Sequence, residues 1–153
     1  MTLVDRERKL RQRIEATPPE QSRQLIRFAW ACVQRTSLPH LSGRSRLLDA
    51  LLMVERWLKG EPVEQLLHAM HDEVFEAALG VGRFEPDMTG LRAACWSVYE
   101  LYQASLTANS RESRRAVRKA ANAAALACRA DDGGPTPSDL DHQERLFQET
   151  FTP

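Results

Sequence analysis

Apolar positions recur at helical spacing through most of the chain, and the pattern is strongest in residues 45–62. The apolar residues there are Leu47, Leu51, Val54 and Leu58 on one stripe, Ala50, Met53 and Trp57 on the next, and Leu48 and Leu52, which widen the arc. A helix that is apolar most of the way round must be covered on several sides. The pattern therefore predicts the central helix of the fold. Gly60 and Pro62 predict where that helix ends, because glycine takes the left-handed cap and proline cannot continue a helix.

The remaining segments also predict helices, and signals for strands are nearly absent. The predicted ranges are 3–15, 18–35, 62–79, 87–108, 109–130 and a short acidic helix from 137 onward. Predicted starts are the capping boxes of Thr17 with Glu20 and Asn109 with Glu112, an N-cap at Asp87, and a capped start in Thr136–Asp139. Short connections favour antiparallel neighbours, so the expected fold is all-α, a single-domain compact bundle of six or seven mostly antiparallel helices.

Each predicted helix carries an apolar face that would point into this core. In 18–35 the face is Leu25, Phe28, Ala29, Cys32 and Val33, with Trp30 lying off it. In 62–79 it is Val63, Leu66, Leu67, Met70, Val74, Ala77 and Ala78, and in 87–108 it is Leu91, Ala94, Cys95, Val98, Leu101 and Tyr102. The alanine-rich end of 109–130 predicts close approach by another helix. We divide residues 1–153 into a charged N-terminal helix or arm (1–16), a helical core (17–130) and an acidic C-terminal segment (131–153).

Overall composition excludes several functional classes. The 153 residues have a formal net charge of zero, so bulk charge does not draw the chain to nucleic acid or anionic lipid. No apolar run approaches the roughly 20 residues that span a bilayer, and the charged N-terminus lacks the apolar region of a secretory signal. Cys32, Cys95 and Cys128 are widely spaced on apolar faces, which indicates reduced, buried thiols in a cytoplasmic protein.

Candidate chemistry is limited to one histidine pair. His68 and His71 lie three residues apart beside Asp72 and Glu73, a spacing at which two imidazoles can share a metal ion. His68 falls outside the apolar stripe and His71 at its edge, and no second ligand pair follows. We therefore interpret them as histidines of the helix surface. The sequence predicts no catalytic residues, no cofactor and no bound metal.

Charge is patterned locally although it sums to zero. Residues 1–13 hold five basic and two acidic side chains, and 131–149 hold six acids, including Asp131 and Asp132, against one arginine. A basic cluster opens the helix at 109–130: Arg111, Arg114, Arg115, Arg118 and Lys119. Its position opposes the helix dipole, which favours acids there. One interpretation is that these charges form a binding surface for an anionic partner. The other is that the acidic segment folds over the basic cluster, or that both are solvated faces of the protein. We favour this other interpretation, in either form.

Three segments carry a resemblance to a known family. They are FAWACVQR, RLLDALLMVERWLKGE and the alanine-rich AANAAALA, and within them the matching positions are Trp30, Ala31, Cys32, Trp57, Gly60 and Glu61. In this order they resemble the Imm5-like immunity proteins of bacterial polymorphic toxin systems, over about Leu25 to Ala130. The resemblance implies an all-helical cytoplasmic protein that binds and blocks a toxin, and it supplies no catalytic residues. The charged first helix and the acidic tail lie outside it.

Two functional hypotheses follow. The first is a non-enzymatic helical protein that binds another protein, specifically an immunity protein neutralising a bacterial toxin, with contacts at Arg111–Lys119 or in the acidic segment. The alternative is a nucleic-acid-binding module that uses the basic N-terminus and the basic cluster. A bundle that binds a small ligand or metal is a third hypothesis.

Overall fold

The computed structural model describes residues 1–108, 113–131 and 133–151. Within these ranges the chain forms seven α-helices and two short 3₁₀ turns and contains no strand, which confirms the all-α bundle. The elements are α1 (Leu3–Glu15), η1 (Pro19–Gln21), α2 (Ser22–Thr36), η2 (Leu38–His40), α3 (Ser45–Leu58), α4 (Glu64–Leu79), α5 (Gly90–Thr107), α6 (Ser113–Cys128) and α7 (Pro137–Phe151).

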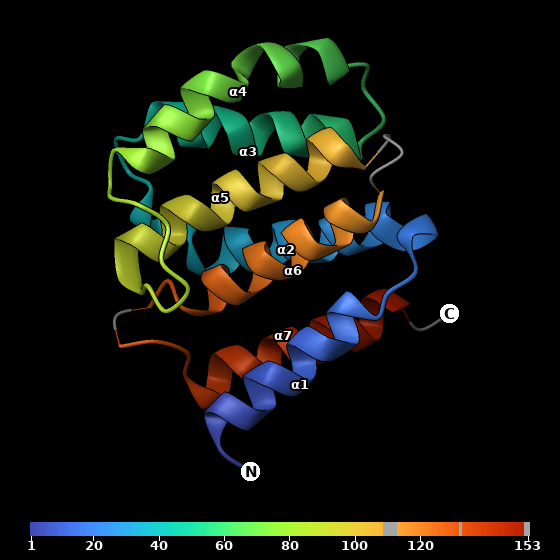
Figure 1. Ribbon diagram of the computed structural model, residues 1–153, viewed down its shortest axis with the longest axis vertical. Helices are drawn as coiled ribbons and strands as arrows, with labels where there is room; N and C mark the ends of the chain where they lie inside the picture. The colour runs from blue at the N-terminus through green and yellow to red at the C-terminus, as the bar shows by residue number, and fades with distance from the viewer. Residues whose placement is uncertain (109–112, 132, 152–153) are drawn as a thin grey trace.

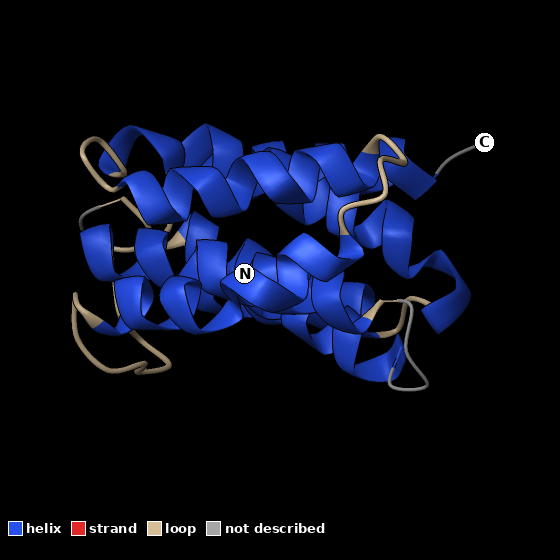
Figure 2. Ribbon diagram, turned by 90° about the horizontal axis from the view of Figure 1, so that it is seen from above, coloured by secondary structure: helices blue, strands red, loops and turns tan. Residues whose placement is uncertain are grey.

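The helices lie in two layers, which are separated when the molecule is seen from above (Figure 2). Helices α4, α5, α6 and α1 follow one another in one layer, and α3, α2 and α7 form the other (Figure 1). The first and last helices pack against each other at one end of the bundle, although they lie at opposite ends of the sequence. This arrangement places α1 directly beside α6.

Helices α5 and α6 occupy the centre of the bundle. Every residue from Ala93 to Val98 of α5 is buried. The face of α6 that meets α5 and α2 is made largely of buried alanines: Ala116, Ala120, Ala121, Ala123, Ala124 and Ala127. Small side chains let neighbouring helix backbones approach closely. The close packing predicted for this alanine-rich segment is therefore confirmed.

Helix α3 does not have the central position that its leucines predict. Its inner face is buried as expected, with Trp57 only 1% exposed. Its partners α5, α4 and α2 cover only part of its circumference, however, and Leu52 is 53% exposed while Leu48 is half-buried. The prediction that other helices enclose α3 is wrong, because its second leucine stripe lies at the surface between α2 and α3.

Two predicted helix starts are also wrong. Thr17 does not cap α2: its N–H bonds to the Ile14 carbonyl at the end of α1, a 3₁₀ turn follows, and α2 begins only at Ser22. Asp87 does not cap α5, which begins at Gly90 with no side-chain cap. The Asn109–Glu112 capping box lies outside the described residues.

Other helix termini follow local sequence signals. The Asp139 N–H donates to Thr136 Oγ1 over 3.1 Å and the Thr136 N–H donates to Asp139 Oδ2, which confirms the capped start of α7. Thr2 and Asp5 form the same capping box at α1, which the sequence analysis did not identify. Gly60 has a φ of +86°, the left-handed cap predicted after α3.

Two leucines predicted to point inward lie at the surface. Leu66 of α4 is 47% exposed and Leu91 of α5 is 36% exposed. Helix α4 buries Leu67, Val74 and Ala78 on a narrower stripe than its apolar pattern suggests, because among the described helices it packs mainly on α3 and α5, at the edge of the bundle.

Candidate partner-binding surface

The basic cluster of α6 lies on the exposed face of that helix. Arg114, Arg115 and Arg118 are exposed, whereas Lys119 is half-buried. Arg111 and Asp132, which were predicted to belong to the binding surface, lie outside the described residues. Asp131 is half-buried in the connection between α6 and α7.

The acidic C-terminal segment does not cover this cluster. Asp141 and Glu144 of α7 pair with Arg6 of α1, and Asp139 pairs with Arg35 of α2 at 2.9 Å. Apolar packing directs α7 to this place, since the Phe147 ring meets the Phe28 ring of α2 edge-on at 5.4 Å between centroids. Of the two forms of the favoured interpretation, the one in which the acidic tail covers the basic cluster is therefore wrong, whereas the exposed arginines agree with the one in which the charges stay solvated. These acids and arginines belong to different contacts.

Asp131 and Asp139 lie together at the start of α7 and influence each other. The hydrogen bond to Asp139 raises the pKa of Asp131, and partial burial adds to this effect. Burial raises the pKa of Asp139 as well, but hydrogen bonds with Asp131, Thr136 and Arg35 outweigh it and hold that pKa below its usual value. Asp131 therefore belongs to the contact that fixes α7 and is not part of the basic surface.

Lys119 forms an internal ion pair. Its Nζ lies 3.0 Å from Oε2 of Glu100, a residue of α5 that is only 5% exposed. Glu100 Oε2 has no hydrogen-bond partner among the described residues, so the contact with Lys119 is an ion pair. Because a buried carboxylate needs a compensating charge, Lys119 serves the α5–α6 contact. We therefore remove Lys119 from the predicted binding residues.

The contact of Arg114 with α1 partly explains why basic residues lie at the start of α6. Its Nη1 donates to the backbone carbonyl of Glu15 over 3.1 Å. Glu15 is the last residue of α1, where unsatisfied carbonyls carry partial negative charge. A side chain that opposes the dipole of its own helix thus complements the dipole of a neighbouring helix.

An aromatic cluster lies on α4, α5 and the loop between them, and the charge of Arg115 acts on its tyrosine. Phe75 of α4 and Phe84 of the α4–α5 loop are 37% and 43% exposed, and both rings contact Trp96 of α5, at 6.2 and 5.8 Å between centroids. Tyr99 contacts Phe75 and Trp96, each at 5.4 Å. Burial raises the pKa of Tyr99, whereas its hydrogen bond with Gln103 and the charge of Arg115 act in the opposite direction.

We call these residues the basic–aromatic surface: Arg114, Arg115, Arg118, Phe75, Phe84 and Tyr99. Trp96 is buried against the three aromatic rings of this surface. The arginines of the surface are visible in the sequence as a cluster, whereas its aromatic part is not. The sequence does hold one signal for the aromatic part, because Phe75 lies outside the apolar stripe predicted for α4. An aromatic residue outside the core stripe of an amphipathic helix meets either a second neighbour or solvent. Phe75 meets both.

His71 contacts polar groups of α5. Its Nε2 lies 2.6 Å from Gln103 Nε2 and 3.3 Å from the Tyr99 hydroxyl, and its Nδ1 lies 3.1 Å from Asp72 Oδ1. His68 is exposed. Among the described residues, no group of three or more histidine, cysteine or carboxylate side chains is placed to hold a metal ion.

The three cysteines are buried and unpaired, as the sequence predicts for thiols of the core. Burial raises the pKa of the Cys128 thiol to about 12 and also raises that of Cys32. Nucleophilic chemistry needs an accessible thiolate. These thiols are instead buried and have raised pKa values, and they contribute to the packing between α2, α5 and α6.

No helix among the described residues is long and apolar enough to span a bilayer. Comparisons with protein-family models, with curated proteins and with solved structures each give no match to this chain.

Proposed function

We propose that this chain is a protein-binding protein that contacts its partner through the basic–aromatic surface. The observation that supports the proposal is the separation of the acidic tail from the basic cluster. Arg6 and Arg35 bind the acids of α7, and the arginines of α6 stay exposed. Arg118 forms no ion pair with any described residue.

The composition of this surface is that of a protein interface. Tyrosine and arginine are enriched among the residues that dominate binding energy, and phenylalanine is enriched in interfaces relative to the rest of the surface. Clustered arginines speed association with an acidic partner and make it depend on salt. The expected partner therefore carries an acidic surface with an apolar centre.

The likeness to immunity proteins suggests one class of partner, a toxin domain whose active site the chain occludes. Co-expression with each toxin encoded near its gene tests this directly. We expect growth to be rescued for one of them and the two proteins to co-purify. If no neighbouring gene product is neutralised or retained, the immunity function is excluded.

A variant of the proposed surface identifies the contact in the same assay. Arg118→Glu combined with Phe84→Ala is expected to abolish rescue while the far-ultraviolet spectrum stays unchanged. The matched control is Arg46→Glu with Leu52→Ala on α3, which changes an equally exposed arginine and a leucine that is 53% exposed. Loss of rescue in the control, or rescue by the first variant, contradicts the assignment of the surface.

Nucleic-acid binding is the second candidate, and one contact favours it. Helix α1 packs beside α6, and Arg114 bonds to the end of α1, so part of the basic N-terminus and the basic cluster share one side of the molecule. A filter-binding assay decides between the candidates. Retention of DNA or RNA that falls steeply with salt supports this function, and absence of retention at low salt excludes it.

A further inference from the structure

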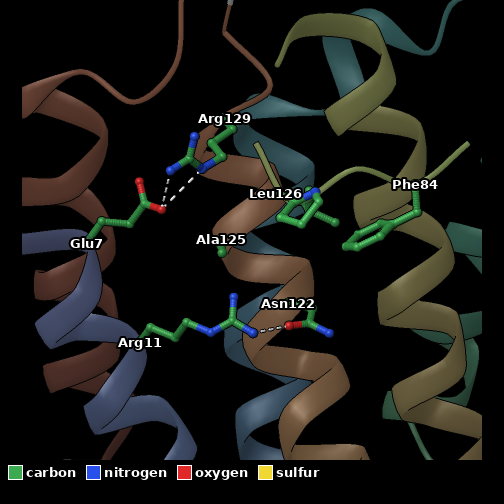
Figure 3. A pocket seen from close by; sticks show the side chains of 8 residues that line it. Glu7, Arg11, Phe84, Asn122, Ala125, Leu126 and Arg129 are labelled. Atoms are coloured by element: carbon green, nitrogen blue, oxygen red, sulfur yellow. Dashed lines mark hydrogen bonds and ion pairs between the residues drawn. The ribbon is translucent and has the colours of Figure 1, made fainter. Parts of the chain in front are cut away.

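A partly open pocket of about 270 Å³ lies between α1, α6 and the α4–α5 loop (Figure 3). Polar side chains line it on the side of α1, and apolar ones line it on the side of the loop. The main lining residues are Glu7, Arg11, Phe84, Asn122, Ala125 and Arg129. Ala125 forms the floor between two larger walls (Figure 3). Because alanine is small, the space above it stays open.

Two guanidinium groups stand on the polar side, each fixed by neighbours. Arg11 donates through Nε to Glu15 Oε1 over 3.0 Å and through Nη2 to Asn122 Oδ1. Arg129 donates through Nε and Nη2 to Glu7 Oε1, over 3.1 and 2.7 Å. The Nη1 group of each arginine forms no hydrogen bond with any described residue. Both arginines thus keep donors for an oxyanion while their positions are held.

The apolar side is a fixed wall. The Phe84 ring packs edge-on against Trp96, and the Trp96 Nε1–H donates to the Gly82 carbonyl over 2.9 Å. Arg92 donates to the Arg83 carbonyl over 2.8 Å. Gly82 has a φ of +120°, and a Cβ at this position would meet Arg92 Nε at 3.0 Å. The loop therefore presents Phe84 in a defined position before any ligand binds.

We propose that this pocket binds a small aromatic carboxylate; the site shares Phe84 with the partner surface proposed above but does not rest on that proposal. The carboxylate accepts from the free N–H donors of Arg11 and Arg129, and the ring packs over Ala125 against Phe84. Glu7 Oε1 already accepts from Arg129 and Glu7 Oε2 is buried, so the guanidinium groups are the charged groups of the polar side that remain open to a ligand. Glu15 and Glu7 each neutralise one of these arginines, so the pocket gains little from the second charge of a phosphate, which costs more to desolvate than the single charge of a carboxylate.

Titration of the isotope-labelled protein with benzoate tests the proposal by NMR. We expect saturable shifts of the Asn122 side-chain amide, the Nε–H signals of Arg11 and Arg129, and the backbone of Phe84. Benzamide has the same shape without the charge and should bind at least about tenfold more weakly, the equivalent of one charge-assisted hydrogen bond. Phenyl phosphate should also bind more weakly than benzoate. Equal binding of benzamide, tighter binding of phenyl phosphate or shifts elsewhere on the surface would overturn the proposal.

Two variants separate the pocket from general charge effects. Ala125→Leu fills the floor while all charges stay in place, and Arg11→Gln removes one donor. Each should weaken benzoate binding at least about tenfold. The control is Arg8→Gln, because Arg8 is exposed on the same helix and pairs only with Asp5. Unchanged affinity in Ala125→Leu, with a well-dispersed spectrum as proof of folding, or an equal loss in Arg8→Gln, refutes the site.

Discussion

Replacing Trp57 with alanine tests how α3 is held in the bundle. The side chain is 1% exposed, and the Arg23 guanidinium lies 4.3 Å from its ring centroid. Removing roughly 200 Å² of buried apolar surface at about 25 cal/mol per Å² gives an upper bound of about 5 kcal/mol. The cation–π contact adds about 0.5–1 kcal/mol, because Arg23 is exposed. Replacing a core tryptophan with alanine typically costs about 3–5 kcal/mol. We therefore expect the free energy of unfolding to fall by about 4 kcal/mol in Trp57→Ala.

Urea unfolding followed by circular dichroism measures this loss. Trp57→Phe keeps an aromatic ring and should lose far less than the alanine variant. Trp30→Ala is the matched control for a tryptophan that is only half-buried. A Trp57→Ala protein within about 1 kcal/mol of the wild type, or as stable as Trp30→Ala, would contradict the burial argument.

Three further outcomes follow from the core contacts. Burial raises the pKa of Asp139, but hydrogen bonds, including one from Arg35, outweigh it and lower that pKa. The ionised group therefore stabilises the fold above about pH 4, and this contribution is lost as pH falls through the folded pKa. Asp139→Asn should destabilise at neutral pH and flatten the acid limb of the stability curve; an unchanged limb contradicts this. A thiol reagent should label no cysteine of the native protein, since burial raises the pKa of Cys128 to about 12, and rapid labelling would show an open core. Tyr102→Phe removes the donor to the buried Leu67 carbonyl and should cost about 1–2 kcal/mol in urea unfolding; no loss would show that the carbonyl is otherwise satisfied.

The sequence predicts the helices well because apolar periodicity and the residues that cap or end a helix are local signals. The positive φ at Gly60 and the capping box at Thr136 follow from a few adjacent residues. Thr17 shows the limit of such signals, since the proline pair after it forms a 3₁₀ turn before α2 begins. Leu52 shows another limit. Periodicity indicates which residues of a helix are apolar, but it does not tell how many neighbours cover that helix.

The candidate surface and the pocket could be predicted only in part, because tertiary contacts decide them. The arginines of α6 are visible as a cluster, but nothing local indicates that α7 pairs with Arg6 and Arg35 instead. The pocket depends on contacts of Arg129 with Glu7 and of Arg11 with Asn122, which lie more than a hundred residues apart. Such pairs follow from the position of α1 beside α6, and that position results from the packing of the whole bundle.

The affinity of the purified partner for wild-type protein and for Arg118→Glu with Phe84→Ala tests the central claim most directly. Calorimetry should give a Kd at least about tenfold higher for this variant, since arginine and aromatic anchors dominate interface energies. The Arg46→Glu with Leu52→Ala control should bind like the wild type. An unchanged Kd for the first variant, or an equal loss in the control, would show that the partner binds elsewhere.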